Sequence, residues 1–296
     1  MQGVAIPITM VAGNSWIHRI NPLPKLFIAL GILVFSFATR NPLLLGVVFA
    51  VGIGLALASG IWKQYFKIVQ IFFPISLTLI SLQSIAPAFP LPWTAIATYG
   101  PFTIYQEGIY SGLSMLLRIY CMTTFALVVI MTSHPSDMFV SLQKIGMPYV
   151  LNFIFTMTLQ LIPILQNEFS TVLSAQKSRG MKGTGFGALL PSMVPVFVGA
   201  IERVQQLSIS LESRAFGSSG TKTSYRNVTF ALKDYVVGVV GVLITAALTA
   251  WVLVHPSLDW SRTLQFTPEV ALTIVLLSTV GFLAFFVVAI VYILRA

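Results

Sequence analysis

Long apolar stretches separated by short polar breaks run through most of the chain, and several approach or exceed the ~18 residues that cross a bilayer as a helix. The pattern predicts six membrane spans, at about Lys25–Thr39, Pro42–Ser59, Ile68–Ala86, Ile109–Thr132, Tyr235–Val254 and Val270–Leu294. The first two are joined by a short break after which Pro42 opens the second helix, and this predicts a tight helical hairpin. Residues 87–107 hold four prolines, which indicates an external connection with little regular structure.

The segment Ser133–Lys233 has a different pattern, because two apolar stretches each grade into a polar, charged helix. These stretches are Tyr149–Leu165 and Ala188–Ile201. If both crossed the membrane, the basic connector Gln166–Gly187 would lie outside, against the usual distribution of charge, and the second stretch is short and contains two prolines. The pattern therefore favours long helices whose first halves lie in or against the membrane and whose second halves lie on its cytoplasmic face.

The predicted fold class is all-α, a polytopic membrane protein with about six transmembrane helices and long cytoplasmic-face coupling helices. Three parts are expected: an N-terminal membrane domain of four spans at 1–132, a coupling-helix region at 133–233 and C-terminal membrane helices at 234–296. No basic segment leads into a short apolar core and a small-residue cleavage site at the N-terminus, so no removable signal peptide is expected.

Composition supports a membrane protein and sets its orientation. Only 8% of the 296 residues are charged and 56% are hydrophobic, whereas soluble domains carry about 25% charged residues. The net charge of +9 is explained by basic cytoplasmic loops, and the basic runs lack the interleaved aromatics of a nucleic-acid surface. With the N-terminus in the cytoplasm, 14 of the 17 Lys and Arg residues lie inside. We expect a multi-pass protein of the plasma membrane with both termini in the cytoplasm.

The chain offers few groups for catalysis or metal binding. Its single cysteine, Cys121, lies in an apolar stretch, which excludes an internal disulfide and argues against a thiolate metal site. The three histidines, His18, His134 and His255, lie in separate regions and form no cluster. We therefore expect no catalytic residue, no metal site and no cofactor, and a protein that is not itself an enzyme.

Two similar arginine motifs stand out in the region 133–233. One is Ser178-Arg179-Gly180 and the other is Ser213-Arg214-Ala215, and each follows a helix with a glutamate upstream, Glu168 or Glu202. Glycines after each motif predict that the helix ends there, so each arginine lies near the negative end of a helix dipole. A single arginine of this kind is an ordinary cytoplasmic cation. Two of them, 35 residues apart on similar helix ends, suit a partner with two similar pockets, such as a dimeric ATPase.

These motifs resemble those of a known family, the transmembrane T components of energy-coupling factor (ECF) transporters, which includes the cobalt transporter subunit CbiQ. The match is most specific over Leu161-Ile162-Pro163, Glu168 and Ala175 to Gly180, and Ser213 to Gly217 resembles the second arginine motif. Ala215 stands where the family commonly has glycine. Further similarity is seen at His18-Arg19-Ile20-Asn21-Pro22 with Lys25, and at Thr132 to Pro135 leading to Gly146-Met147-Pro148. The resemblance covers residues 14–254.

The resemblance implies a function and partners. In such a transporter the T component sits on two ATP-binding-cassette (ABC) ATPases, identical or different, and Arg179 and Arg214 would each insert into a groove of one of them. The flanking Ser178, Gly180, Ser213 and Ala215 would belong to the same contacts. ATP-driven movement would then pass to a membrane-embedded S component that binds a vitamin or metal ion. The chain itself would bind neither nucleotide nor substrate.

Two other functions compete with this one. A secondary transporter or permease working without ATPases would need ionisable residues inside its spans and usually an internal repeat, but the spans contain almost no ionisable residues and the two halves of the chain do not mirror each other. A membrane-embedded enzyme acting on lipid would need a cluster of His, Asp or Glu at one membrane surface. Both alternatives predict activity from the chain alone, whereas a T component acts only with its partners.

Overall fold

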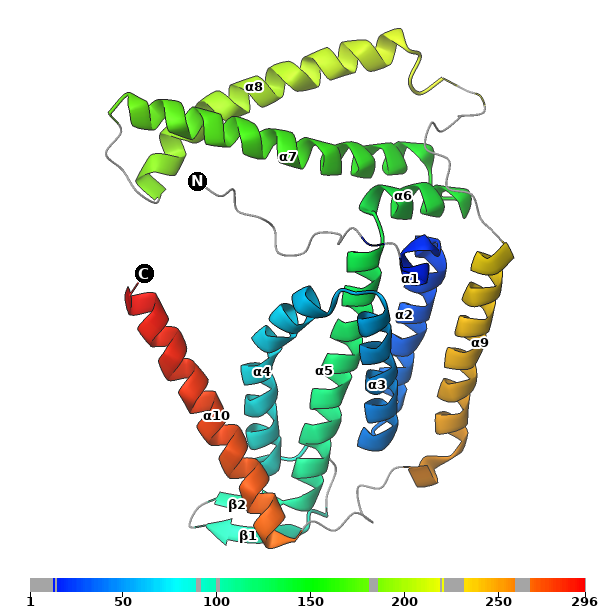
Figure 1. Ribbon diagram of the computed structural model, residues 1–296, viewed down its shortest axis with the longest axis vertical. Coiled ribbons are helices and arrows are strands. Elements are labelled where there is room, and N and C mark those ends of the chain that lie inside the picture. The colour runs from blue at the N-terminus through cyan, green and yellow to red at the C-terminus, as the bar shows by residue number, and fades with distance from the viewer. Residues whose placement is uncertain are drawn as a thin grey trace. The chain divides into compact units, whose positions relative to one another are not determined.

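The computed structural model describes residues 13, 15–88, 92–99, 102–180, 186–218, 220, 232–258 and 267–295. Over these residues the chain forms ten α-helices, a short 3-10 helix and one two-stranded sheet (Figure 1). It divides into two compact units, Met1–His134 with Phe230–Ala296, and Pro135–Thr229. Lys182, Lys222, Arg226, Arg262 and parts of the two glycine-rich connectors that follow the arginine motifs lie outside the described residues.

The first unit is a bundle of helices with a small sheet. Its elements are α1 (Trp16–Arg19), α2 (Pro22–Ala38), α3 (Pro42–Ala58), α4 (Trp62–Ile85), β1 (Ala95–Tyr99), β2 (Phe102–Tyr105), α5 (Gln106–Thr132), α9 (Leu232–Val254), η1 (Pro256–Leu258) and α10 (Pro268–Arg295). Each of the six predicted spans is a helix in the structure, with ends that differ from the prediction by a few residues.

The predicted short connection between the first two spans, with Pro42 opening the second helix, is confirmed, although α2 and α3 each pack on α5 more than on one another. Proline occupies the first position of both α2 and α3, where a missing N–H costs nothing. An asparagine caps each start: the side-chain oxygen of Asn21 accepts from the Leu23 amide at 3.4 Å, and that of Asn41 accepts from the Leu43 amide at 2.9 Å.

Four described helices, α4, α5, α7 (Tyr149–Ser178) and α9, are long and apolar enough to cross a membrane, and α2, α3 and the first part of α10 are apolar but shorter. Helix α7 meets this criterion although its sequence pattern favours a helix lying partly on the membrane surface. It belongs to the second unit, and its place relative to the membrane stays a prediction.

The six long helices of the first unit alternate in direction, so their ends fall into two groups (Figure 1). At one end, which we call the junction end, lie the starts of α2, α4 and α9 and the end of α5; the amide of Asn21 donates there to Asp234 at 3.0 Å. At the opposite end the side chain of Asn41 donates to the Leu258 carbonyl at 2.6 Å. The end of α5 and the start of α9, which border the second unit along the sequence, therefore both lie at the junction end.

The expectation of little regular structure in residues 87–107 was wrong. Strands β1 and β2 pair antiparallel there, with Thr98 opposite Thr103, and α5 begins at Gln106. Pro87 and Pro92 precede β1, where a missing amide breaks no ladder hydrogen bond. The carboxylate of Glu107 anchors the hairpin to α5 by accepting from the amide and the hydroxyl of Thr94, at 3.0 and 2.6 Å.

The second unit contains α6 (Pro135–Lys144), α7 and α8 (Phe186–Ser213). Helix α6 packs on α7 through stacked rings of Phe139 and Phe155, 5.1 Å apart, and a 2.7 Å hydrogen bond from Asn152 to Gln143. Helices α7 and α8 run antiparallel and cross (Figure 1).

Candidate functional site: two arginine-capped helix ends

The first predicted site lies where α7 ends. Arg179 is the C-cap residue, and its amide donates to the carbonyls of Ala175 and Gln176 at 3.1 and 3.2 Å. Gly180 follows with φ of +90°, a left-handed conformation that glycine adopts without strain, and its amide donates to Lys177 at 3.1 Å. The helix therefore ends at the arginine, and the three predicted residues Ser178, Arg179 and Gly180 form one turn.

The second site, at the end of α8, repeats this geometry. The amide of Arg214 donates to Ser210 and Leu211, and Ala215 has φ of +54°. The amides of Ala215 and Phe216 then bond back to Glu212 and Leu211, at 2.9 Å each, which completes a Schellman motif. Ala215 thus adopts the left-handed conformation that glycine usually supplies, which explains the preference for glycine at this position in the sequence motif.

Both guanidinium groups are exposed. Arg179 and Arg214 are exposed, and so are the small residues beside them: Ser178, Gly180, Ser213 and Ala215. The ion pair found among the described residues joins Arg203 to Glu168 and involves neither of the two arginines. An arginine that stands free at the end of a helix, with small neighbours, is able to enter a groove on another protein.

The structure places the two arginine ends apart from each other. Phe216, two residues after Arg214, packs against the first turns of α7, with ring centroids 5.7 Å from Tyr149 and 4.5 Å from Phe153. Arg179 caps the opposite end of the same helix, whose 30 residues correspond to roughly 45 Å. The two sites therefore lie at opposite ends of the α7–α8 pair, separated by most of a long helix.

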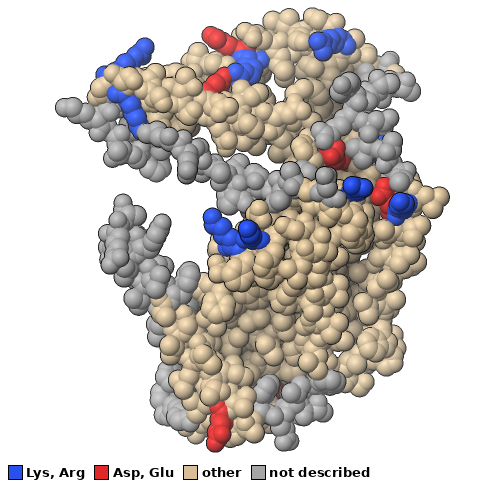
Figure 2. Space-filling view, in the orientation of Figure 1, with Lys and Arg blue, Asp and Glu red and all other residues tan. Residues whose placement is uncertain are grey.

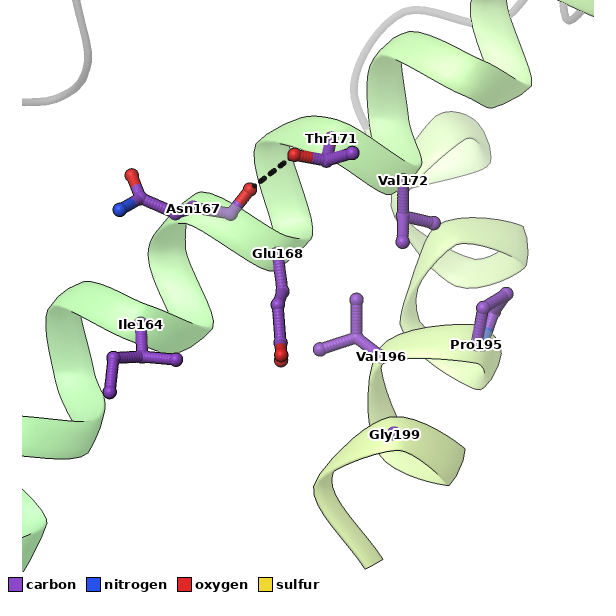
Figure 3. Close-up of a pocket in the computed structure, with 8 residues that line it drawn as sticks. All are labelled: Ile164, Asn167, Glu168, Thr171, Val172, Pro195, Val196 and Gly199. Carbon is purple, nitrogen blue, oxygen red and sulfur yellow. Dashed lines mark hydrogen bonds between the residues drawn. The ribbon is translucent and has the colours of Figure 1, made fainter. Parts of the chain in front are cut away.

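Between the two ends, α7 and α8 meet around an open cleft of about 380 Å³ (Figure 3). Its lining is largely apolar and comes from both helices: Ile164, Asn167, Glu168, Thr171, Val172, Pro195, Val196 and Gly199. Figure 3 shows the Glu168 side chain extending from α7 toward α8, while the Thr171 hydroxyl bonds back to the Asn167 carbonyl of its own helix at 2.9 Å.

Lys25 has a structural role that its sequence context did not reveal. It was counted among the basic residues of the cytoplasmic side, but its side chain is buried, with 8% exposed. Its ammonium group donates to the carbonyl and hydroxyl of Thr132, both at 3.2 Å, and to the Ser133 hydroxyl at 3.3 Å. A cation at a helix C-terminus satisfies carbonyls that the helix leaves open, so Lys25 fastens α2 to the last turn of α5, just before α6 begins.

Arg118 lies within the fourth predicted span, on α5. Its guanidinium donates to the carbonyls of Ser36 and Thr39 at 2.7 and 3.0 Å and lies 5.5 Å from the Phe37 ring centroid. It therefore caps the end of α2 in the way that Lys25 caps the end of α5.

Charged residues of the first unit are distributed unevenly. Four exposed basic residues lie on α1 and in the first turns of α4 and α9, at the junction end: Arg19, Lys63, Lys67 and Lys233. At the opposite end, between α2 and α3, Arg40 is exposed. Figure 2 shows uncharged residues over most of the rest of this unit on the face in view. Over the described residues, no group of three His, Cys, Asp or Glu side chains is placed to hold a metal ion.

The fold and this site define a class: a polytopic helical membrane protein with a second helical unit that carries two arginine-capped helix ends. Residues 13–225 match the family model of CbiQ, described as a cobalt transport protein, and the chain therefore belongs to this family. It is 30% identical over 258 residues to the energy-coupling factor transporter transmembrane protein EcfT of Bacillus selenitireducens, with 81% of this chain and 94% of the relative covered.

Other relatives carry the same name. The EcfT protein of Leuconostoc gelidum subsp. gasicomitatum is 27% identical, with 76% of this chain and 89% of the relative covered, and that of Bacillus subtilis is 26% identical, with 80% and 94% covered. The chain is thus the transmembrane T component of an ECF transporter, a multi-pass membrane protein and a non-catalytic subunit. The secondary transporter and the membrane-embedded lipid enzyme are set aside by this finding.

Proposed function

We propose that this T component transmits conformational change from two ABC ATPases to a membrane-embedded S component, which takes up a vitamin or a metal ion. Arg179 and Arg214 each enter a groove of one ATPase subunit. The two ATPase subunits are either identical or different chains. The ATPases hydrolyse ATP, the S component binds the substrate, and this chain connects them without binding either small molecule.

The observation that carries this proposal is the pair of matching arginine C-caps, one at the end of α7 and one at the end of α8, which lie at opposite ends of the antiparallel α7–α8 pair. Two contacts that lie far apart can engage two subunits at once, whereas two adjacent contacts would compete for one. When the subunits of an ATPase dimer approach each other, both helix ends move, and the helices carry that movement along their length.

The residue types suit the contact. A guanidinium keeps its charge when it is desolvated and presents five donors in a fixed plane, so it anchors better in a polar groove than an ammonium does. Ser178 and Gly180 at one end, and Ser213 and Ala215 at the other, are small enough to let the partner surface reach the helix end.

We place the junction end of the first unit on the cytoplasmic side of the plasma membrane, with both chain termini inside. The exposed basic residues at that end support this orientation through the positive-inside rule. In this orientation Arg179 and Arg214 are accessible to the ATPases, which are soluble proteins of the cytoplasm.

The proposal predicts that Arg179→Ala combined with Arg214→Ala abolishes co-purification of the ATPases and uptake, while the protein still inserts in the membrane. Each buried arginine anchor in an interface commonly contributes about 2 kcal/mol or more, so losing both weakens binding by roughly a thousandfold. The measurement is the recovery of ATPase subunits with affinity-tagged protein, together with substrate uptake by cells.

Lys177→Ala combined with Glu212→Ala is the matched control, since both residues are exposed and lie two positions before each arginine. The control should retain both ATPase binding and uptake. Full uptake by the double arginine variant would refute the proposed role of these residues.

A further inference from the structure

An ion pair joins the two helices that carry the arginine motifs. Arg203 of α8 donates through Nη2 to Oε1 of Glu168 on α7. Each side chain is about a third exposed, 33% for Arg203 and 32% for Glu168. Figure 3 shows the Glu168 side chain in the space between the two helices. The pair therefore connects α7 to α8 directly at the place where they cross.

The position of this pair along the two helices is symmetric. Glu168 precedes Arg179 by 11 residues, and Arg203 precedes Arg214 by 11 residues. Eleven residues of α-helix are about three turns and roughly 16 Å, and they return to nearly the same face of the helix. Because α7 and α8 run antiparallel, two arms of equal length extend from the ion pair in opposite directions, and each arm ends in one arginine.

Each member of the pair depends on the other. The second carboxylate oxygen of Glu168 and the Nη1 of Arg203 are buried and have no hydrogen-bond partner among the described residues. The neighbouring cleft wall is formed by apolar side chains such as Val172 and Val196, which cannot replace a lost charge partner. Removing one member therefore leaves the other charge partly buried and unpaired, and the local packing must change to let water reach it.

We propose that Glu168 and Arg203 are positioning residues that set the crossing of α7 and α8, and thereby the separation of Arg179 and Arg214. This inference rests on the proposed function for its consequence, because the two arginines act through the ATPases. A crossing held by the ion pair makes the helices move as a connected pair. Without the pair, movement of one arginine end is taken up at the crossing and is not passed to the other helix.

The distance between the two arginine ends tests the geometric part without any partner. Spin labels are placed at Lys177→Cys and Glu212→Cys in the purified full chain in lipid nanodiscs, where the native Cys121 is buried and out of reach of the label. Glu168→Gln or Arg203→Gln should broaden and shift the distance distribution. The swap Glu168→Arg with Arg203→Glu should restore it, because the pair is rebuilt with its charges exchanged.

Transport tests the consequence. In the assembled complex, each single variant should still bind both ATPases and hydrolyse ATP, while uptake per ATP hydrolysed falls by about fivefold or more, the lower end of ordinary coupling between sites. The swap should recover this ratio. Glu202→Gln is the matched control: it makes the same change as Glu168→Gln at an exposed residue next to Arg203 on α8, and it should leave the ratio and the distances unchanged.

Unchanged distances in the single variants, or a swap that fails to restore them, would overturn the positioning role. Single variants that lose ATPase binding altogether would show a structural role and likewise refute it. If the proposed function itself were wrong, the outcome would differ. The unaltered protein would then recover no ATPases, while the distances between the labels would still change when the ion pair is removed.

Discussion

At the scale of single residues, Ala215 adopts a conformation that its side chain disfavours. Its φ of +54° is the left-handed region, which costs an L-residue with a Cβ about 1 kcal/mol. The two hydrogen bonds of the Schellman motif and the packing of Phe216 on Phe153 hold it there. At the equivalent point of α7, Gly180 has φ of +90° without this strain.

We therefore predict that Ala215→Gly stabilises the end of α8 by about 0.5 kcal/mol, because relief of the strained backbone exceeds the entropy that glycine adds to the unfolded chain. Slower amide hydrogen exchange over residues 210–216 would show it. Ala200→Gly, in the middle of the same helix, is the control of opposite sign and should destabilise by about 1 kcal/mol. A loss of protection in both variants would contradict the strain argument.

Lys25 shows a limit of sequence analysis at the same scale. A lysine just before an apolar span is normally a cation at the membrane surface, and nothing nearby in sequence indicates burial. Its hydrogen-bond partners, Thr132 and Ser133, lie more than a hundred residues away along the chain. Only the packing of α2 against α5 brings them within reach.

At the scale of elements, small residues control how closely the membrane helices approach. A Cβ added to Gly108 at the start of α5 would lie 2.2 Å from the backbone oxygen of Gln83 in α4. One added to Gly31 of α2 would lie 2.4 Å from the hydroxyl oxygen of Thr245 in α9. Lipid tails are as apolar as the helix surfaces, so the hydrophobic effect does not drive helices together within the membrane. Helix association there depends on close packing of this kind.

Gly108→Val should accordingly force α4 and α5 apart and destabilise the protein by about 1–3 kcal/mol, the usual cost of overpacking. The readout is a lower melting temperature of the purified protein in detergent. Gly46→Val is the matched control: it makes the same change in helix α3, where an added Cβ has no neighbour within 4 Å. Equal losses in the two variants would mean that helix propensity, and not the close approach, is responsible.

The β-hairpin at the opposite end of the bundle is another element that needed the tertiary structure. The four prolines of residues 87–107 suggested an irregular chain, and the alternation of apolar and polar residues over 95–105 is too short to predict a sheet. The pairing of Thr98 with Thr103 and the anchoring of Thr94 to Glu107 stabilise a sheet of two strands that would be marginal alone.

At the scale of the whole molecule, the alternating helices and the distribution of charge determine the orientation that we propose. In a Cys121→Ser background, Thr98→Cys on β1 should react with a membrane-impermeant maleimide in intact cells. Lys63→Cys, exposed at the junction end, should react only after the cells are permeabilised. The reverse pattern would invert the topology and remove the arginine ends from the cytoplasm.

The sequence by itself determined the membrane class, the six apolar helices of the first unit, the helix start at Pro42 and the helix ends at Arg179 and Arg214. These features depend on local properties: apolar length, proline and asparagine at helix starts, and small residues after an arginine. The motifs also led to the family to which the chain belongs.

The tertiary structure alone decided which distant residues meet. It placed the two arginine ends at opposite ends of the α7–α8 pair, joined Glu168 to Arg203 at the crossing, and directed Lys25 and Arg118 to the ends of neighbouring helices. These contacts follow from the directions in which helices pack, and residues that are far apart along the chain carry no local signal of their future neighbours.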